Sequence, residues 1–175
     1  LTAAPLRAVV AHVYLALKGR TLKDGATITY DERGVPIVDY GYVGTTYIGP
    51  QPNPVSVCLR FLEYYDAYFY MYGNLSPSAG GERDTYLRIA LNNADWLIDN
   101  AVWRDGYVVF EYEFPWQDYN MTPPWRSAMA QGLALQVLIR SYDLTKERKY
   151  LDAARGVIKS FYVEVQDGGV TYKTP

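Results

Sequence analysis

The stretch Tyr86-Leu87-Arg88-Ile89-Ala90 recurs in outline further along the chain as Tyr150-Leu151-Asp152-Ala153-Ala154, and this repeat decides the expected fold. The two copies lie in residues 82–102 and 146–163, where apolar residues recur at helical spacing on one side and charged residues occupy the other. Each segment then runs into a turn that contains Asp-Gly and a short strand-like run. Both repeats therefore predict an amphipathic outer helix followed by a β excursion.

Residues 54–72 and 124–144 alternate with these amphipathic segments and are apolar almost all the way round, which predicts burial on most sides. Inner and outer helices that alternate are typical of stacked helix hairpins, which curve into an α/α toroid. We therefore predict a mainly α fold, part of an α/α toroid, with short β-hairpins at the N-terminus and between the helix hairpins. Arg60, Glu63 and Asp66 fall inside residues 54–72 and argue against a membrane span.

Two regions are expected. Residues 1–53 form an N-terminal lead-in, with a helix over residues 5–18 and a hairpin whose turn lies at residues 31–34, where Pro36 would restrict its strand to a sheet edge. Residues 54–175 form the helical domain, which we expect to be truncated at its C-terminal end. The chain begins at Leu1 without a leader-like segment, which suggests a processed or engineered start.

Composition narrows the classes of partner. The 17 Lys and Arg residues nearly balance 19 Asp and Glu residues, and no basic stripe occurs, so nucleic-acid binding is not expected. The single cysteine, Cys58, leaves the compartment undecided. With His12 as the one histidine, no metal site of several histidines can form, and we expect neither a metal nor a cofactor. The 18 tyrosines suit a sugar-binding surface, or else fill the core.

The stretch Pro124-Trp125-Arg126-Ser127-Ala128-Met129-Ala130-Gln131-Gly132 resembles a segment of the C-terminal catalytic domain of D-glucuronyl C5-epimerases, in which Ser-Ala-Met-Ala-Gln-Gly also occurs. The likeness continues through residues 138–145 and extends loosely over residues 27–175. It implies conversion of glucuronyl to iduronyl residues in a polysaccharide, by removal and return of the C5 proton. Arg126 departs from the family, which often has an aromatic residue at this position.

The segments assigned to catalysis in animal members of that family do not occur in this sequence: a Glu-Glu-Tyr loop and later Tyr- and Trp-containing segments. Because loss of one member of a catalytic set costs orders of magnitude in rate, the chain alone is expected to be inactive. An uncovered apolar flank on the inner helices would also favour a homo-oligomer.

Removal of a proton next to a carboxylate requires a base, an acid and donors that stabilise the developing charge. The richest set of such groups lies in residues 110–119, from which four catalytic candidates follow: Glu111, Glu113, Tyr112 and Tyr119. Predicted substrate-binding residues are Trp116, Trp125 and Arg126. Strand alternation places Glu111 and Glu113 on one face and Tyr112 on the other. We expect Glu111, Glu113, Tyr119 and Arg126 to open onto one concave surface.

Other interpretations of these residues remain open. The same stretch could be a hairpin with two solvated carboxylates and Tyr112 packed inward, or Glu111, Glu113 and Asp118 could bind Ca²⁺. Arg126, expected in the first turn of a helix, suits a substrate carboxylate or is a plain surface residue. Two glutamines on that helix, Gln131 and Gln136, need hydrogen-bond partners if they are buried.

Three function classes follow from these observations. The first is a uronyl C5-epimerase, and the second a glycan-binding or glycan-cleaving toroid without epimerase activity, because a fold does not fix function. A structural helical-repeat module is the third. Solvent deuterium incorporation at C5 of a glucuronyl polymer separates the first class from the others.

Overall fold

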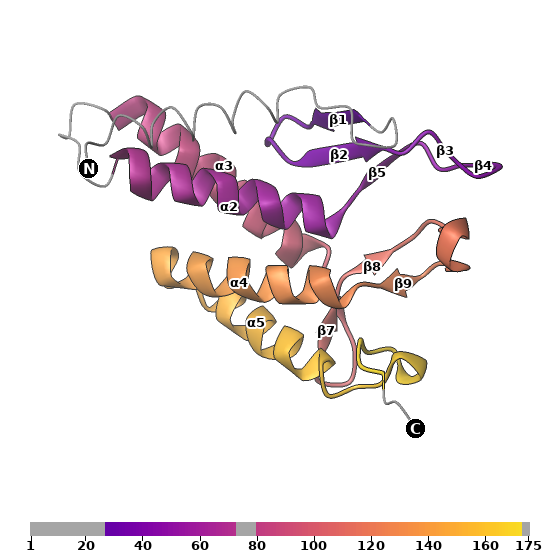
Figure 1. Cartoon of the computed structure of the whole chain (residues 1–175). Helices are drawn as coiled ribbons and strands as arrows, with labels where there is room; N and C mark the ends of the chain where they lie inside the picture. Colours follow the sequence, from indigo (N-terminus) through magenta and orange to yellow (C-terminus); the bar gives the residue numbers. More distant parts are fainter. Residues whose placement is uncertain (1–26, 73–79, 173–175) are drawn as a thin grey trace, which may run out of the picture.

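A computed structural model describes residues 27–72 and 80–172, so the helix predicted over residues 5–18 lies outside the described residues. In the described part, four helices are present: α2 (Pro54–Tyr72), α3 (Gly80–Asp99), α4 (Ala128–Thr145) and α5 (Arg148–Ser160). Helix α2 packs against α3, α4 packs against α5, and the two pairs meet where α2 packs against α4 (Figure 1). The predicted placement of α2 beside α4 is thus confirmed.

Nine short strands accompany these helices in the described part, and they form four small antiparallel sheets. The first sheet has the order β1 (Thr27–Tyr30), β2 (Pro36–Asp39), β5 (Pro50–Pro52). Three two-stranded ribbons follow: β3 (Tyr42–Val43) with β4 (Thr46–Tyr47), β6 (Val102–Trp103) with β7 (Val108–Val109), and β8 (Glu111–Tyr112) with β9 (Trp125–Arg126). Short 3₁₀ turns lie at η2 (Gln117–Tyr119) and η3 (Val165–Asp167).

The prediction of a mainly α toroid is therefore wrong, because the described chain is a mixed α and β structure. Two-residue strands carry no alternation of polar and apolar residues that a sequence pattern could reveal. Glycines in the left-handed region produce the reversals that let the chain pair with itself. Gly41, Gly44 and Gly49, at φ values of 56°, 61° and 66°, surround the β3–β4 ribbon.

Two predicted boundaries also need correction. The helix expected over residues 124–144 begins only at Ala128, because Trp125 and Arg126 pair with β8, and Ser127 caps the helix by accepting a hydrogen bond from the backbone N–H of Ala130. Arg126 is thus a strand residue. Pro36 does not confine β2 to an edge, because β2 is the middle strand of its sheet and Pro36 stands at its first position, where proline is tolerated.

The main core lies between the four helices. Phe61 of α2, Leu97 of α3, Leu138 of α4 and Tyr150 of α5 are each at most 1% exposed and belong to one cluster. Residues of this kind bury the inward face of each helix, which is the largest favourable contribution to folding.

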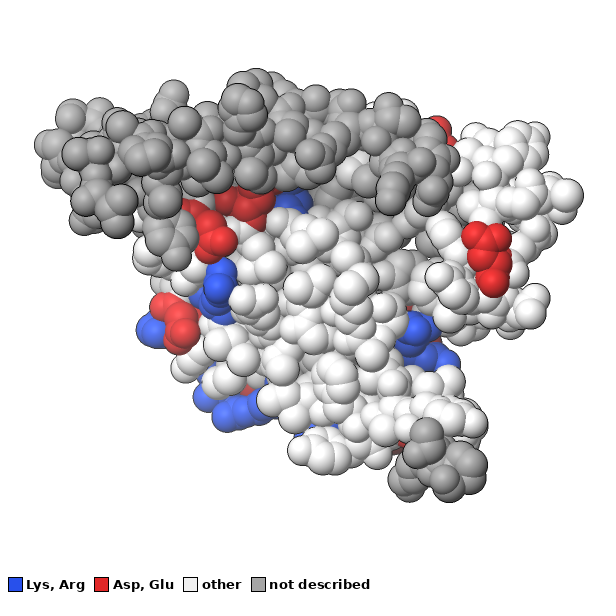
Figure 2. All heavy atoms as spheres, viewed as in Figure 1, with Lys and Arg blue, Asp and Glu red and all other residues white. Residues whose placement is uncertain are grey.

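Most described side chains of α2 and α4 are buried or partly buried, as predicted, but each helix also has an exposed side. Leu59 and Phe69 on α2, and Met129 and Ile139 on α4, are between 43% and 63% exposed. Figure 2 shows that uncharged atoms occupy the centre of the face that these two helices present. None of the described helices has the length and apolar character needed to span a membrane.

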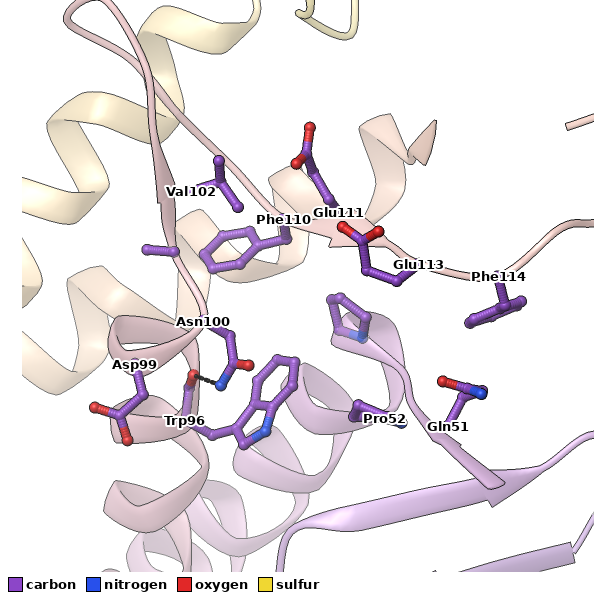
Figure 3. Close-up of a pocket in the computed structure, with 12 residues that line it drawn as sticks. Gln51, Pro52, Trp96, Asp99, Asn100, Val102, Phe110, Glu111, Glu113 and Phe114 are labelled. Atoms are coloured by element: carbon purple, nitrogen blue, oxygen red, sulfur yellow. Dashed lines mark hydrogen bonds between the residues drawn. The ribbon is translucent and has the colours of Figure 1, made fainter. Parts of the chain in front are cut away.

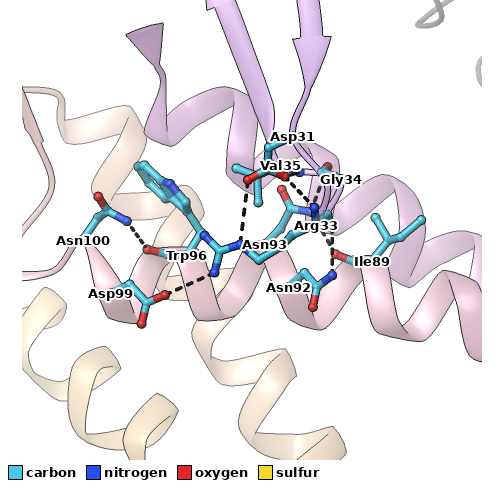
Figure 4. A network of polar contacts seen from close by, with 10 residues as sticks. All are labelled: Asp31, Arg33, Gly34, Val35, Ile89, Asn92, Asn93, Trp96, Asp99 and Asn100. Atoms are coloured by element: carbon cyan, nitrogen blue, oxygen red, sulfur yellow. Dashed lines mark hydrogen bonds and ion pairs between the residues drawn. The ribbon is translucent and has the colours of Figure 1, made fainter.

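The hairpin of β1 and β2 is anchored to α3 through its turn (Figure 4). Asn92 and Asn93 donate hydrogen bonds to the carbonyl oxygens of Arg33 and Gly34 at 2.8 and 3.4 Å, and the guanidinium of Arg33 lies 3.4 Å from a carboxylate oxygen of Asp99. These contacts hold the first sheet, and hence β5, beside the C-terminal half of α3.

Candidate functional site

The β8–β9 ribbon brings together the residues that the sequence singled out. Glu111 lies opposite Arg126 in the register, and Tyr112 lies opposite Trp125. Because neighbouring side chains in a strand point to opposite faces, the charged pair occupies one face of the ribbon and the aromatic pair occupies the other. The predicted alternation of Glu111 and Tyr112 follows from this register.

A charged cluster forms on the first face, which we name the arginine cluster: Arg104, Glu111 and Arg126. One oxygen of Glu111, Oε1, lies 2.6 Å from Nη2 of Arg104 and 2.6 Å from Nη1 of Arg126. The Glu111 side chain is 7% exposed, whereas those of Arg126 and Arg104 are 15% and 38% exposed. The hydrogen bond to Glu111 raises the pKa of Arg104 further. Two cations therefore share one anion, which leaves an excess positive charge and unused N–H donors.

The aromatic face of the ribbon is a packing surface. The rings of Tyr112 and Trp125 stack with centroids 3.9 Å apart and planes 6° from parallel. Tyr112 is 4% exposed, its hydroxyl donates to Oδ1 of Asn53 at 3.2 Å, and burial raises its pKa above the usual value. The indole N–H of Trp125 donates to the carbonyl oxygen of Phe114. These contacts match the interpretation in which Tyr112 packs inward.

Two further predicted residues, Trp116 and Tyr119, lie in the loop that joins β8 to β9. Trp116 is partly buried and meets Tyr40 edge to face, with ring centroids 5.3 Å apart. Tyr119, in η2, is 73% exposed. Gln117 ties this loop to the β3–β4 ribbon through hydrogen bonds with Thr46 and the backbone of Thr45. Tyr119 thus lies in the connecting loop and not on the paired strands that carry Glu111 and Arg126.

A pocket of about 330 Å³ lies between α3, β5, the start of α2 and the β8 strand (Figure 3). Its lining residues come from these elements and the segments next to them: Gln51, Pro52, Pro54, Trp96, Asp99, Asn100, Ala101, Val102, Phe110, Glu111, Glu113 and Phe114. The structure thus brings Glu111 and Glu113 to one concave surface, while Arg126 meets Glu111 across the ribbon and Tyr119 lies outside the lining.

Gln131 fixes the position of the strand that carries Glu111. This fully buried side chain accepts a hydrogen bond from the backbone N–H of Phe110 at 2.9 Å and donates to the carbonyl oxygen of Val108 at 2.9 Å and to Oγ of Ser160 at 3.0 Å. The Gln131 amide therefore forms hydrogen bonds with the backbone of residues 108–110 in the way that a neighbouring strand would. Gln131 thus has the partners that its burial demands, whereas Gln136 is exposed on the same helix.

Sequence reasoning missed two residues of this region. Arg104 comes from the turn between β6 and β7, and its contact with Glu111 depends on how that turn folds back. Trp96, 9% exposed on α3, contributes its ring to the pocket (Figure 3). A tryptophan near the end of an amphipathic helix was the signal available in the sequence. Among the described residues, no group of three or more His, Cys, Asp and Glu side chains is placed to hold a metal ion.

Comparisons with known proteins agree with the resemblance noted in the sequence. Residues 104–174 match the family described as D-glucuronyl C5-epimerase C-terminus. A D-glucuronyl C5-epimerase of Caenorhabditis elegans is 38% identical over 78 residues, which is 44% of this chain and 13% of the relative. An uncharacterized protein of Methanocaldococcus jannaschii is 29% identical over 156 residues, 85% of this chain and 49% of the relative.

No solved structure matches the chain. The chain spans about half the length of the archaeal relative and a smaller part of the nematode enzyme. The matched region begins at Arg104 and contains Glu111, Arg126 and Gln131. Residues 104–174 are therefore similar to the C-terminal domain of the D-glucuronyl C5-epimerase family.

Proposed function

We propose that this chain is part of a uronyl C5-epimerase and that its arginine cluster holds the carboxylate of the uronic acid in a polysaccharide. The observation that carries the proposal is the sharing of one Glu111 oxygen by Arg104 and Arg126. Two guanidiniums beside one carboxylate keep N–H donors for a second carboxylate, and the planar guanidinium group suits that ligand.

The chemistry of C5 epimerisation explains why such a cluster would matter. Loss of the C5 proton moves negative charge onto the neighbouring carboxylate, so cations placed there stabilise the transition state more than the ground state. In this proposal Glu111 does not carry the proton. Its carboxylate already contacts both guanidiniums and is 7% exposed, so its role is to hold them in place.

Glu113 is the stronger candidate for proton transfer. It is exposed, lines the pocket and follows β8 directly. Tyr112 is less suited to this role, because its hydroxyl is buried against Asn53. The proposal assigns turnover to the intact protein, because the chain corresponds to only part of its relatives. The 175-residue chain alone is proposed to bind the polymer without exchanging its C5 proton.

The test of the proposed function is solvent exchange at C5. A glucuronyl polymer is incubated in D₂O with the intact protein or with this chain, and C5 is followed by NMR. Deuterium at C5 with the intact protein supports the proposal. Binding of the polymer without exchange by the intact protein would instead favour the second function class, a glycan-binding protein, and absence of both would contradict both classes.

A further inference from the structure

The two Asp-Gly turns of the sequence repeat meet in the structure. The first, Asp105-Gly106, lies between β6 and β7, and the second, Asp167-Gly168, ends the 3₁₀ turn η3. Both glycines are in the left-handed region, with φ values of 82° and 93°. Tyr107, which follows the first turn, is 8% exposed, and its hydroxyl donates a hydrogen bond to the carbonyl oxygen of Asp167 at 3.0 Å. This phenol therefore joins the two turns.

The second turn lies against Arg104, a member of the arginine cluster. A Cβ atom at Gly168 would be 2.9 Å from the hydroxyl oxygen of Tyr107, and 3.8 and 3.9 Å from Cδ and Nε of Arg104. A larger residue would therefore displace the phenol and touch the stem of the guanidinium group. The absence of a side chain at Gly168 lets the backbone of this turn approach both residues closely.

The second turn is also connected to the strand segment that carries Glu111. Next to the turn, the backbone N–H of Val170 donates to the carbonyl oxygen of Ser160 at 3.4 Å. The hydroxyl of Ser160 accepts a hydrogen bond from Gln131, whose amide also binds the backbone of residues 108–110. The turn and the strand segment are thus fixed to the same end of α5.

We propose that Tyr107 is a positioning residue for the arginine cluster. Its hydrogen bond to Asp167 keeps the Gly168 turn against Arg104, and the turn restricts the guanidinium to the orientation in which it receives a carboxylate. The Arg104 side chain is 38% exposed, and among the described residues its ion-pair partner is Glu111 alone. An arginine loses much rotamer freedom when it is immobilised, so restriction before binding lowers the cost of holding a ligand.

The inference rests on the proposed function only for the ligand, a uronate carboxylate. Whether Tyr107 restricts the motion of Arg104 can be measured without any ligand. The positioning role and the proposed function can therefore fail separately.

The experiment compares the full 175-residue chain with Tyr107→Phe, which keeps the ring and removes the hydroxyl. The first measurement is the NMR order parameter of the Arg104 Nε–H group, whose signal Arg104→Lys identifies, and we expect it to fall in Tyr107→Phe. The second is the affinity for a glucuronate-containing oligosaccharide and for the same oligosaccharide with its carboxylates reduced to alcohols. We expect the native oligosaccharide to bind about threefold more weakly to Tyr107→Phe, and the reduced one to be unaffected.

Matched variants separate positioning from general stability. Tyr162→Phe removes a hydroxyl from a residue that is 84% exposed and should change neither measurement. Gly168→Ala pushes on the phenol from the other side and should reproduce both effects of Tyr107→Phe, which also provides a test if that variant does not fold. Gly41→Ala is its control, because Gly41 has a φ of 56° and open space around its Cβ position.

The outcomes distinguish the two proposals. An Arg104 order parameter that is the same in Tyr107→Phe, Gly168→Ala and the unmodified chain would overturn the inference. Equal losses of affinity for the native and the reduced oligosaccharide would also overturn it, because a merely structural role of Tyr107 predicts that result. If the unmodified chain binds both oligosaccharides equally while the Arg104 order parameter still falls in Tyr107→Phe, the proposed function fails and the positioning role stands.

Discussion

Glu111 and Arg126 face each other across the β8–β9 ribbon, with a carboxylate oxygen and a guanidinium nitrogen 2.6 Å apart. Glu111 is the first residue of β8, and Arg126 directly precedes Ser127, the N-cap of α4. The ion pair thereby connects the β7–β8 segment to the helix that begins with the Ala-Met-Ala-Gln-Gly part of the family segment.

Loss of Arg126 should destabilise the chain. Arg126→Ala leaves the 7% exposed Glu111 carboxylate with Arg104 alone, and we expect the free energy of unfolding to fall by about 1–3 kcal/mol in urea titrations. Arg155→Ala is the control, because its pair with Asp152 lies on the surface and should contribute about 0.5 kcal/mol or less. Equal losses in the two variants would show that the cluster has no special stability.

The two glutamines of α4 provide a comparison within one helix. Gln131→Leu leaves the N–H of Phe110 and the carbonyl of Val108 buried without this partner, and should cost about 2–4 kcal/mol. The same change at the exposed Gln136 should alter stability by about 0.5 kcal/mol or less. Chemical denaturation measures both variants. Similar losses at the two positions would contradict the bridging role of Gln131.

Cys58 should report on unfolding. The thiol is 0% exposed, and burial raises its pKa above the ordinary value, so both access and thiolate formation are suppressed in the native state. We expect a thiol reagent at about pH 8 to label the single cysteine rapidly in denaturant and only by way of unfolding in buffer. Labelling at the same rate in both conditions would contradict this burial.

Glu63 gives a pH dependence with a defined sign. Burial raises the pKa of its carboxyl despite the opposing effect of Arg60, whose guanidinium lies 2.9 Å away. Because the folded-state pKa is the higher one, folding favours the protonated form. The stability contribution of this group is therefore fully present below the ordinary value of 4.5 and is lost as pH rises through the raised value.

Glu63→Gln imitates the protonated form and keeps an acceptor for Arg60. The variant should therefore be more stable relative to the unmodified chain at about pH 7 than at about pH 4, so that its free energy of unfolding minus that of the unmodified chain is larger at pH 7. Urea titrations at the two pH values measure the difference, with the exposed Glu147→Gln as the reference for general charge effects. A relative stability that falls as pH rises would reverse the assigned sign.

The sequence predicted those parts of the fold whose signals are local. Helix α2 has the predicted bounds, because Pro54 marks its first turn and the Gly73-Asn74 sequence follows its end. The start of α4 was misplaced because the pairing of Trp125 with Tyr112 is non-local. The toroid prediction failed for the same reason, since the short strands in the described part of the chain depend on turns and pairing rather than on periodicity.

The residue types of the candidate site could be predicted from the sequence, whereas the contacts between their side chains could be predicted only in part. Glu111, Glu113 and Arg126 stood out as charged residues next to aromatic ones. In the structure, Glu111 lines the same pocket as Glu113 and forms an ion pair with Arg126. Arg104 could not be linked to Glu111 in advance, because their contact requires the β6–β7 turn to fold back. Catalytic roles for these residues remain predictions.

The central claim is that the arginine cluster recognises a uronate carboxylate. The most direct measurement is calorimetric titration of the chain with a glucuronate-containing oligosaccharide and with the same oligosaccharide after reduction of its carboxylates to alcohols. We predict that the native oligosaccharide binds about tenfold more tightly, and that Arg104→Ala removes most of this difference because a charge-assisted contact of this kind contributes about 1.4 kcal/mol. Equal affinity for the native and the reduced oligosaccharide, or a difference that Arg104→Ala leaves intact, would contradict the account.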